Sequence, residues 1–126
     1  MTGTVLVVED DEDVLRMVST ILVGRGLEVR LARDGRTAIK SIRERRPDAI
    51  VLDIMMPGMD GIQVLDQLKG DAHTAPIPVI LVTALVQDED VLKGYKSGAD
   101  YYLTKPFTSR QLVYAIDLVL GGARPI

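Results

Sequence analysis

The sequence predicts an α/β protein in which helices cover both faces of a five-stranded parallel sheet. Three short segments, 5–8, 49–52 and 79–82, are apolar at every position, which is typical of central strands buried between two helical layers. Segments 27–32 and 101–104 mix polar and apolar residues, and we expect them at the two sheet edges. Three central and two edge strands fit the order 2-1-3-4-5 of a flavodoxin-like, doubly wound (βα)5 fold.

The edge segment 27–32 alternates, so that Leu27, Val29 and Leu31 share one face and Glu28 and Arg30 share the other. Such alternation indicates a strand with one covered face and one that is less covered.

Longer segments between the strands carry apolar residues at every third or fourth position, as amphipathic helices do. The apolar stripes contain Val14, Val18, Ile21 and Leu22; Ala38, Ile39 and Ile42; Ile62, Leu65 and Leu68; Val91, Leu92 and Tyr95; and Leu112, Ile116, Val119 and Leu120. Gly24 and Gly26 indicate the end of the first helix, and Asp34-Gly35 the start of the second. Acidic residues 88–90 are expected at the start of the fourth, where they favour the helix dipole.

Length and composition restrict the class of protein. The 126 residues fit one domain, which we place at 1–120, with 121–126 as a flexible tail or the stump of a linker. The absence of cysteine excludes disulfides and thiolate metal sites and is compatible with the cytoplasm. No signal peptide or membrane-spanning run is evident. A net charge of −3 argues against non-specific nucleic-acid binding.

Acidic residues follow two strands that the predicted order makes neighbours. Glu9, Asp10 and Asp11 follow the first strand, and Asp53 follows the third. The switch point of this fold lies between those strands, so at least three carboxylates should meet there. An all-oxygen site with no histidine or cysteine suits Mg²⁺. Asp11 is better explained as the N-cap of the first helix.

Two other strand ends supply groups of complementary chemistry to the same rim. Thr83 offers a hydroxyl at the end of the fourth strand, and Lys105 offers an ammonium after the fifth. Carboxylates, a hydroxyl and an ammonium that converge on one rim are suited to handling a phosphoryl group.

Four motifs in this order resemble the receiver domain of two-component response regulators, as in single-domain, chemotaxis-type regulators. They are VLVVEDDEDV, VLDIMMPGMDG, VILVTA and YYLTKPF, and the resemblance covers essentially the whole chain. It implies a phosphoacceptor switch that catalyses only its own phosphorylation and dephosphorylation and is not otherwise an enzyme.

The resemblance also implies a role for individual residues. Asp53 would accept a phosphoryl group from a phosphohistidine, and Lys105 would pair first with Asp53 and then with the phosphoryl group. Mg²⁺ would be held by Asp53, by Asp10 directly, by Glu9 largely through water, and by the backbone carbonyl of Met55.

Activation would reach partners through a conformational change. Thr83 would bond the phosphoryl oxygen and Tyr102 would turn inward, which would alter the face of the fourth helix, fifth strand and fifth helix. The peptide bond between Lys105 and Pro106 would be cis. The implied partners are a sensor histidine kinase or phosphotransfer protein, a downstream effector protein or missing effector domain, and a second copy bound through the same face.

Met55 and Leu85 stand two residues after the acceptor and two after Thr83, where residues of this family influence loss of the phosphoryl group. Neither side chain can orient a water molecule by hydrogen bonding, so we expect slow self-dephosphorylation. The group Met55, Met56 and Met59 either covers the apolar floor beside the acid pocket or forms an adaptable partner surface.

Three other functions fit parts of the pattern. A haloacid dehalogenase-type phosphatase also uses an aspartyl nucleophile and Mg²⁺, but it needs a second aspartate where this chain has Met55. A flavin or nucleotide binder needs a phosphate-cradling loop after the first strand, where this chain has three acids. A degenerate receiver that only binds partners would not require Asp10, Asp53, Thr83 and Lys105 together.

Overall fold

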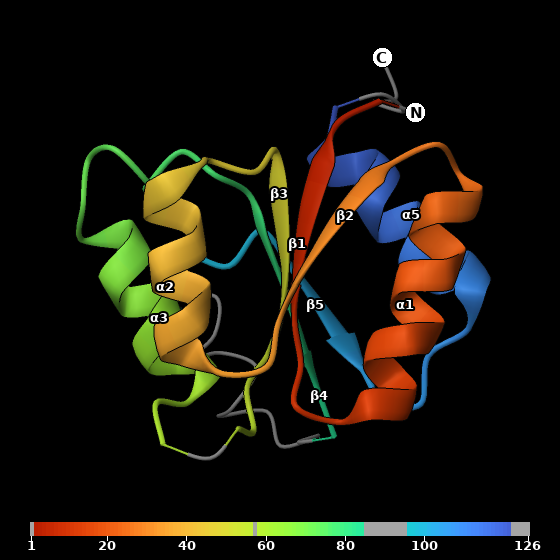
Figure 1. Cartoon of the computed structure of the whole chain (residues 1–126), viewed down its shortest axis with the longest axis horizontal. Coiled ribbons are helices and arrows are strands. Elements are labelled where there is room, and N and C mark those ends of the chain that lie inside the picture. Colours follow the sequence, from red (N-terminus) through yellow and green to blue (C-terminus); the bar gives the residue numbers. More distant parts are fainter. Residues whose placement is uncertain (1, 57, 85–95, 122–126) are drawn as a thin grey trace.

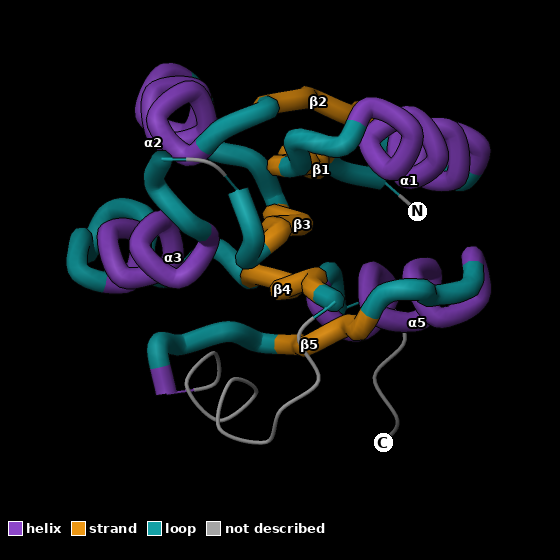
Figure 2. The backbone as a smooth tube through the Cα atoms, turned by 90° about the horizontal axis from the view of Figure 1, so that it is seen from below, coloured by secondary structure: helices purple, strands orange, loops and turns teal. Residues whose placement is uncertain are grey.

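The computed structural model describes residues 2–56, 58–84 and 96–121, and it shows helices on both faces of a single parallel sheet (Figures 1 and 2). The strands are β1 (Thr4–Val8), β2 (Glu28–Ala32), β3 (Ala49–Asp53), β4 (Val79–Thr83) and β5 (Tyr101–Thr104). The helices are α1 (Glu12–Gly24), α2 (Gly35–Glu44), α3 (Gly61–Lys69) and α5 (Ser109–Val119).

The predicted strand order is confirmed. All strand pairs are parallel, and the sheet has the order β2-β1-β3-β4-β5. Every residue of β3 and β4 is buried, whereas β2 and β5 are only partly covered at the sheet edges. Because both faces of a central strand are covered by helices, such a strand can be apolar at consecutive positions.

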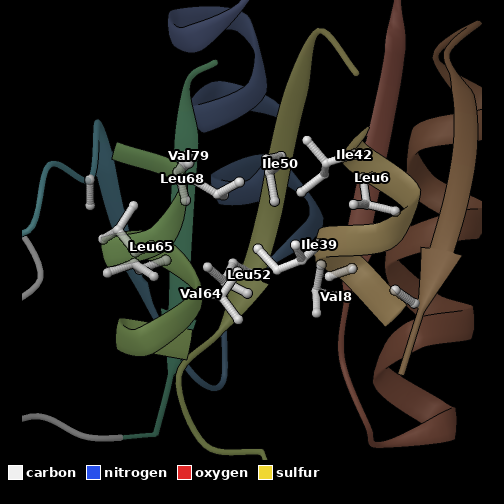
Figure 3. Packing of buried hydrophobic residues seen from close by; sticks show 14 of the residues in the cluster. Leu6, Val8, Ile39, Ile42, Ile50, Leu52, Val64, Leu65, Leu68 and Val79 are labelled. Atoms are coloured by element: carbon white, nitrogen blue, oxygen red, sulfur yellow. The ribbon is translucent and has the colours of Figure 1, made fainter. Parts of the chain in front are cut away.

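The two faces of the sheet carry separate hydrophobic layers. One layer packs α2 and α3 on the sheet, with Leu52 of β3, Ile42 of α2 and Leu65 of α3 among its members (Figure 3). The other packs α1 and α5 on the opposite face, with Val51 of β3 among its members. The fourth helix that we expect from Val91, Leu92 and Tyr95 and from acidic residues 88–90 lies outside the described residues.

Polar side chains fix the starts of all four described helices. Asp11, Asp34, Asp60 and Thr108 are N-caps that accept hydrogen bonds from backbone N–H groups of the first turn. The predicted capping role of Asp11 is thus confirmed, since its Oδ1 accepts from the N–H groups of both Asp13 and Val14. These caps set where each helix begins relative to the strand ends that precede it.

The prediction for one face of β2 is wrong at Leu31. Leu27 is buried and Val29 is half-buried, but Leu31 is 48% exposed. Because β2 is an edge strand, no strand of the described residues lies beyond it whose side chains could help to cover Leu31. Arg30, expected on the less covered face, is half-buried, and its guanidinium donates to the carbonyls of Ser41 and Arg45 at the end of α2.

No helix among the described residues is both long enough and apolar enough to cross a membrane.

Candidate functional site

Carboxylates from two neighbouring strands meet at the carboxyl edge of the sheet. Val8 of β1 pairs with Leu52 of β3, so Glu9 and Asp53, the next residues, lie side by side. Oxygen atoms of Glu9, Asp10 and Asp53 all lie within 4.8 Å of one another. Glu9 is 3% exposed and Asp53 is 4% exposed, whereas Asp10 is exposed. The structure therefore brings together the acids that the sequence places at the switch point.

Lys105, the residue after β5, supplies the positive charge of the site from across β4. Its Nζ donates to Glu9 Oε1 at 2.6 Å and to Asp53 Oδ2 at 3.4 Å. The backbone of Lys105 is held by its N–H, which donates to the carbonyl of Thr83 at 2.8 Å. The closer contact is with Glu9. The sequence did not predict this contact, because residue spacing does not show which of several carboxylates an ammonium approaches most closely.

The electrostatics of Glu9 and Lys105 follow from burial and from their neighbours. Burial raises the pKa of the Glu9 carboxyl to about 7; the neighbouring Asp53 adds to this shift and the Lys105 ammonium opposes it. Burial alone would lower the pKa of Lys105, but Glu9 and Asp53 outweigh it and the net shift is upward. One ammonium thus offsets only part of the negative charge in this pocket.

The donor set fits a hard divalent cation. Among the described residues, Glu9 Oε2 is the buried side-chain oxygen that lacks a hydrogen-bond partner. An orphaned carboxylate oxygen within reach of two other carboxylates is an unfavourable arrangement that a cation would relieve. The group contains only oxygen ligands, which Mg²⁺ prefers over nitrogen and sulfur.

The chain that leaves Asp53 is held close to the strand end. The N–H of Met55 donates to Asp53 Oδ1 at 3.2 Å, and the N–H of Gly61 donates to the carbonyl of Ile54 at 2.9 Å. A Cβ at Gly61 would lie 2.3 Å from the carbonyl oxygen of Asp53, so only glycine lets α3 begin here. Gly58 has a φ of +76°, which favours glycine in the intervening turn. Pro57 lies outside the described residues.

Thr83 and Tyr102 lie on the two strands beyond β3. Thr83 ends β4 and is fully buried, while Tyr102 is half-buried on β5 and packs against the layer below α2 and α3. The peptide bond between Lys105 and Pro106 is cis, which is the isomer that the family resemblance implied.

The sequence left open whether Met55, Met56 and Met59 cover the apolar floor beside the acid pocket or form a surface for a partner. Met56 is buried in the layer below α2 and α3, and Met59 packs against that layer. Met55 is 57% exposed beside the acid pocket. The group is therefore partly core and partly surface.

Fold and site together define an α/β protein with a lysine and a pocket of carboxylates that could hold a metal ion at the switch point of the sheet. The family model for the response regulator receiver domain matches residues 5–117. The chain therefore belongs to the family of response regulator receiver domains.

Characterised relatives and solved structures agree with this assignment. The chain is 39% identical to the phosphate regulon transcriptional regulatory protein PhoB of Escherichia coli, over 100% of this chain and 55% of the relative. It is 40% identical to the DNA-binding response regulator MtrA of Mycolicibacterium paratuberculosis, over 90% of this chain and 49% of the relative. It thus spans about half the length of these curated relatives.

Among solved structures, the signal receiver domain of a histidine kinase from Syntrophus aciditrophicus superposes with a TM-score of 0.89. The two chains are 35% identical, and the match covers 98% of this chain and 94% of the other. As a receiver domain, this chain is a phosphoacceptor signalling domain of a two-component system.

Proposed function

We propose that Asp53 is the phosphoacceptor and takes a phosphoryl group from the phosphohistidine of a sensor kinase or phosphotransfer protein. An Asp53 carboxylate oxygen attacks phosphorus, the O–P bond forms, and the P–N bond breaks with its electron pair going to the imidazole, which then takes a proton. The observation that carries this proposal is the burial of the Asp53 carboxylate within 3.4 Å of the Lys105 ammonium and beside two further acids.

We assign the Mg²⁺ ligands to Asp53, Asp10, Glu9 (through water) and the backbone carbonyl of Met55. When bound, the ion neutralises charge on the phosphoryl oxygens as they approach the acid pocket. The orphaned Glu9 Oε2 supports this assignment, because it needs a positive partner that Lys105 does not give it.

Lys105 orients Asp53 and then stabilises negative charge on the transferred group, as an ammonium close to a dianion does. Thr83, at the end of the strand beside Asp53, donates its hydroxyl to a phosphoryl oxygen, and Tyr102 turns inward. These shifts alter the face that includes β5 and α5, to which we assign the downstream partner or a second copy. The fourth-helix part of this face lies outside the described residues.

The domain catalyses its own phosphorylation and dephosphorylation and turns over no other substrate. It acts in the cytoplasm, and its output passes to an effector protein or to an effector domain elsewhere in a longer chain. Two full-length relatives are described as transcriptional or DNA-binding regulators, which supports an effector domain of that kind.

Incubation with acetyl phosphate and Mg²⁺, followed by intact mass measurement, tests the proposal. We expect the wild-type chain to gain the mass of one phosphoryl group, and the gain to disappear in Asp53→Asn or after chelation of the metal. Asp66→Asn is a matched control, because it removes an exposed carboxylate on α3 away from the pocket. A wild-type chain that gains no mass would instead be a degenerate receiver.

A further inference from the structure

Charge is distributed unevenly along the chain. Residues 25–46 contain eight of the fifteen lysines and arginines but only three of the eighteen acidic residues. An acidic protein therefore presents one basic region, formed by β2, α2 and the segments beside them. The phosphoacceptor site does not use these residues, so the accumulation of positive charge needs another explanation.

Part of this positive charge stabilises the fold. The Arg30 guanidinium donates to carbonyls at the end of α2, Arg33 pairs with Glu12 at 3.0 Å, and Arg45 pairs with Glu28 at 3.3 Å. These three arginines already have partners within the chain.

A second group of cations is unpaired within the described part of the chain. Arg36, Lys40 and Arg43 are exposed and form no ion pair or hydrogen bond through their side chains in residues 2–56, 58–84 and 96–121. They stand at i, i+4 and i+7, so they follow one stripe along α2. Such a stripe is a positive surface available to an external partner.

The helices α2 and α3 lie next to each other on one side of the sheet (Figures 1 and 2). The stripe borders a hollow that is lined by residues of α2 and α3 and by Met59. This groove has a volume of about 410 Å³ and is lined by the three cations and by Ile39, Met59 and Gln67, with Glu44 at one end. Ile39 is almost fully buried and Met59 is half-buried. The groove therefore combines an apolar floor with positively charged walls.

We propose that this α2–α3 groove binds an acidic peptide segment of a partner protein, with an apolar side chain on Ile39 and Met59. Carboxylates on either side of that apolar residue would pair with Arg36, Lys40 and Arg43. Electrostatic complementarity would supply orientation and association rate, and burial of the apolar side chain would supply affinity. The flexible Met59 side chain can adapt to the apolar residue that enters.

The lining favours a peptide over nucleic acid or an anionic membrane. A phosphate backbone gains nothing from the apolar floor, whereas a peptide can bury an apolar side chain there. A membrane surface would need protruding apolar side chains, whereas Ile39 is almost fully buried and Met59 is half-buried. Peptide binding here does not depend on phosphorylation of Asp53, so it can be tested separately.

Fluorescence anisotropy with a labelled peptide of glutamates around a central leucine tests this proposal. We expect the triple variant Arg36→Gln, Lys40→Gln, Arg43→Gln to bind at least about tenfold more weakly than the wild type. The matched control is Arg16→Gln, Lys96→Gln, Arg110→Gln, which removes the same charge from exposed positions outside residues 25–46. It should retain most of the affinity.

Two further comparisons address the apolar floor and the identity of the partner. Replacing the central leucine of the peptide by serine should also weaken binding to the wild type. The single variant Lys40→Glu repeats the charge test if the triple variant has a lowered melting temperature. Equal loss in the control variant, or no effect of the leucine, would overturn the proposal. Tighter binding of an RNA duplex or of phosphatidylserine vesicles than of the peptide, lost in the same triple variant, would also overturn it.

Discussion

The Lys105 ammonium lies 2.6 Å from Glu9 Oε1 but 3.4 Å from Asp53 Oδ2, so its stronger partner is Glu9. Because Glu9 belongs to the group of carboxylates that could hold a cation, Mg²⁺ would compete with Lys105 for Glu9. Lys105 would then be released toward Asp53 and the arriving phosphoryl group. Metal binding and preparation of the acceptor would then be coupled through this one ammonium.

The charge on Glu9 is predicted to destabilise the metal-free protein. Glu9→Gln should raise the free energy of unfolding by about 1 kcal/mol at neutral pH without metal. The substitution removes a buried charge, one of whose oxygens has no hydrogen-bond partner, while Lys105 retains Asp53 as an ion-pair partner. Added Mg²⁺ should stabilise the wild type, by about 2.7 kcal/mol at a hundred times Kd, and the variant much less. Urea unfolding with and without Mg²⁺ measures both effects.

Glu12→Gln is the control for this experiment, since it neutralises an exposed acid of the same segment that pairs with Arg33. A Glu9→Gln protein that is less stable without metal, yet equally stabilised by Mg²⁺, would show that Glu9 is neither strained nor a ligand.

The close approach of α3 to the acceptor is predicted to be essential. Gly61→Ala places a Cβ 2.3 Å from the Asp53 carbonyl oxygen, so the backbone at the site must move. We expect a loss of about 1–3 kcal/mol in the free energy of unfolding and slower phosphorylation by acetyl phosphate. Gly24→Ala is the control, because nothing lies within 4 Å of a Cβ there, and it should not lower stability. Equal behaviour of the two variants would contradict the steric explanation.

Met55 is predicted to prolong the life of the phosphorylated state. Its backbone N–H donates to Asp53, its side chain is exposed, and a thioether cannot orient a water molecule for attack on phosphorus. Met55→Asn, alone or with Leu85→Glu, should shorten the phosphoryl half-life at least about threefold, which corresponds to a barrier lowered by at least about 0.65 kcal/mol. Decay of the phosphorylated mass after removal of acetyl phosphate measures this half-life. Met17→Asn changes an exposed methionine of α1 instead and should leave it unaltered; an unaltered half-life in Met55→Asn would refute the prediction.

The Asp34 cap is predicted to make stability depend on acid pH. Its pKa lies below the ordinary value of 3.8, because the carboxylate accepts hydrogen bonds from the backbone N–H and the hydroxyl of Thr37. A folded-state pKa below the unfolded value means that this stabilisation is complete above about pH 4 and is lost as the pH falls through the folded pKa.

Asp34→Asn keeps a capping oxygen without the charge, so it should flatten this part of the pH profile, whereas Asp34→Ala should cost about 1 kcal/mol at neutral pH. Melting temperatures measured between pH 2 and pH 7 compare the three proteins. An unchanged slope in Asp34→Asn would assign the acid dependence to other carboxyl groups.

Sequence reasoning predicted the parts of the molecule that depend on repeating patterns. Apolar runs such as 79–82 gave the central strands, and the strand order then placed Glu9 beside Asp53. The pattern could not show that Leu31 is exposed or that Arg30 caps the end of α2, because both depend on where neighbouring elements stop. The preference of Lys105 for Glu9 is likewise a difference of less than 1 Å, below anything that residue spacing can resolve.

Chemical mapping of the phosphorylated residue is the decisive test of Asp53 as the acceptor. Borohydride reduces an aspartyl phosphate to homoserine, so the position of homoserine in the digested, phosphorylated protein identifies the residue that carried the group. We expect homoserine at position 53 alone, dependent on both acetyl phosphate and Mg²⁺. Homoserine at position 10, or a phosphoryl group that survives reduction on a serine or threonine, would contradict the assignment of Asp53.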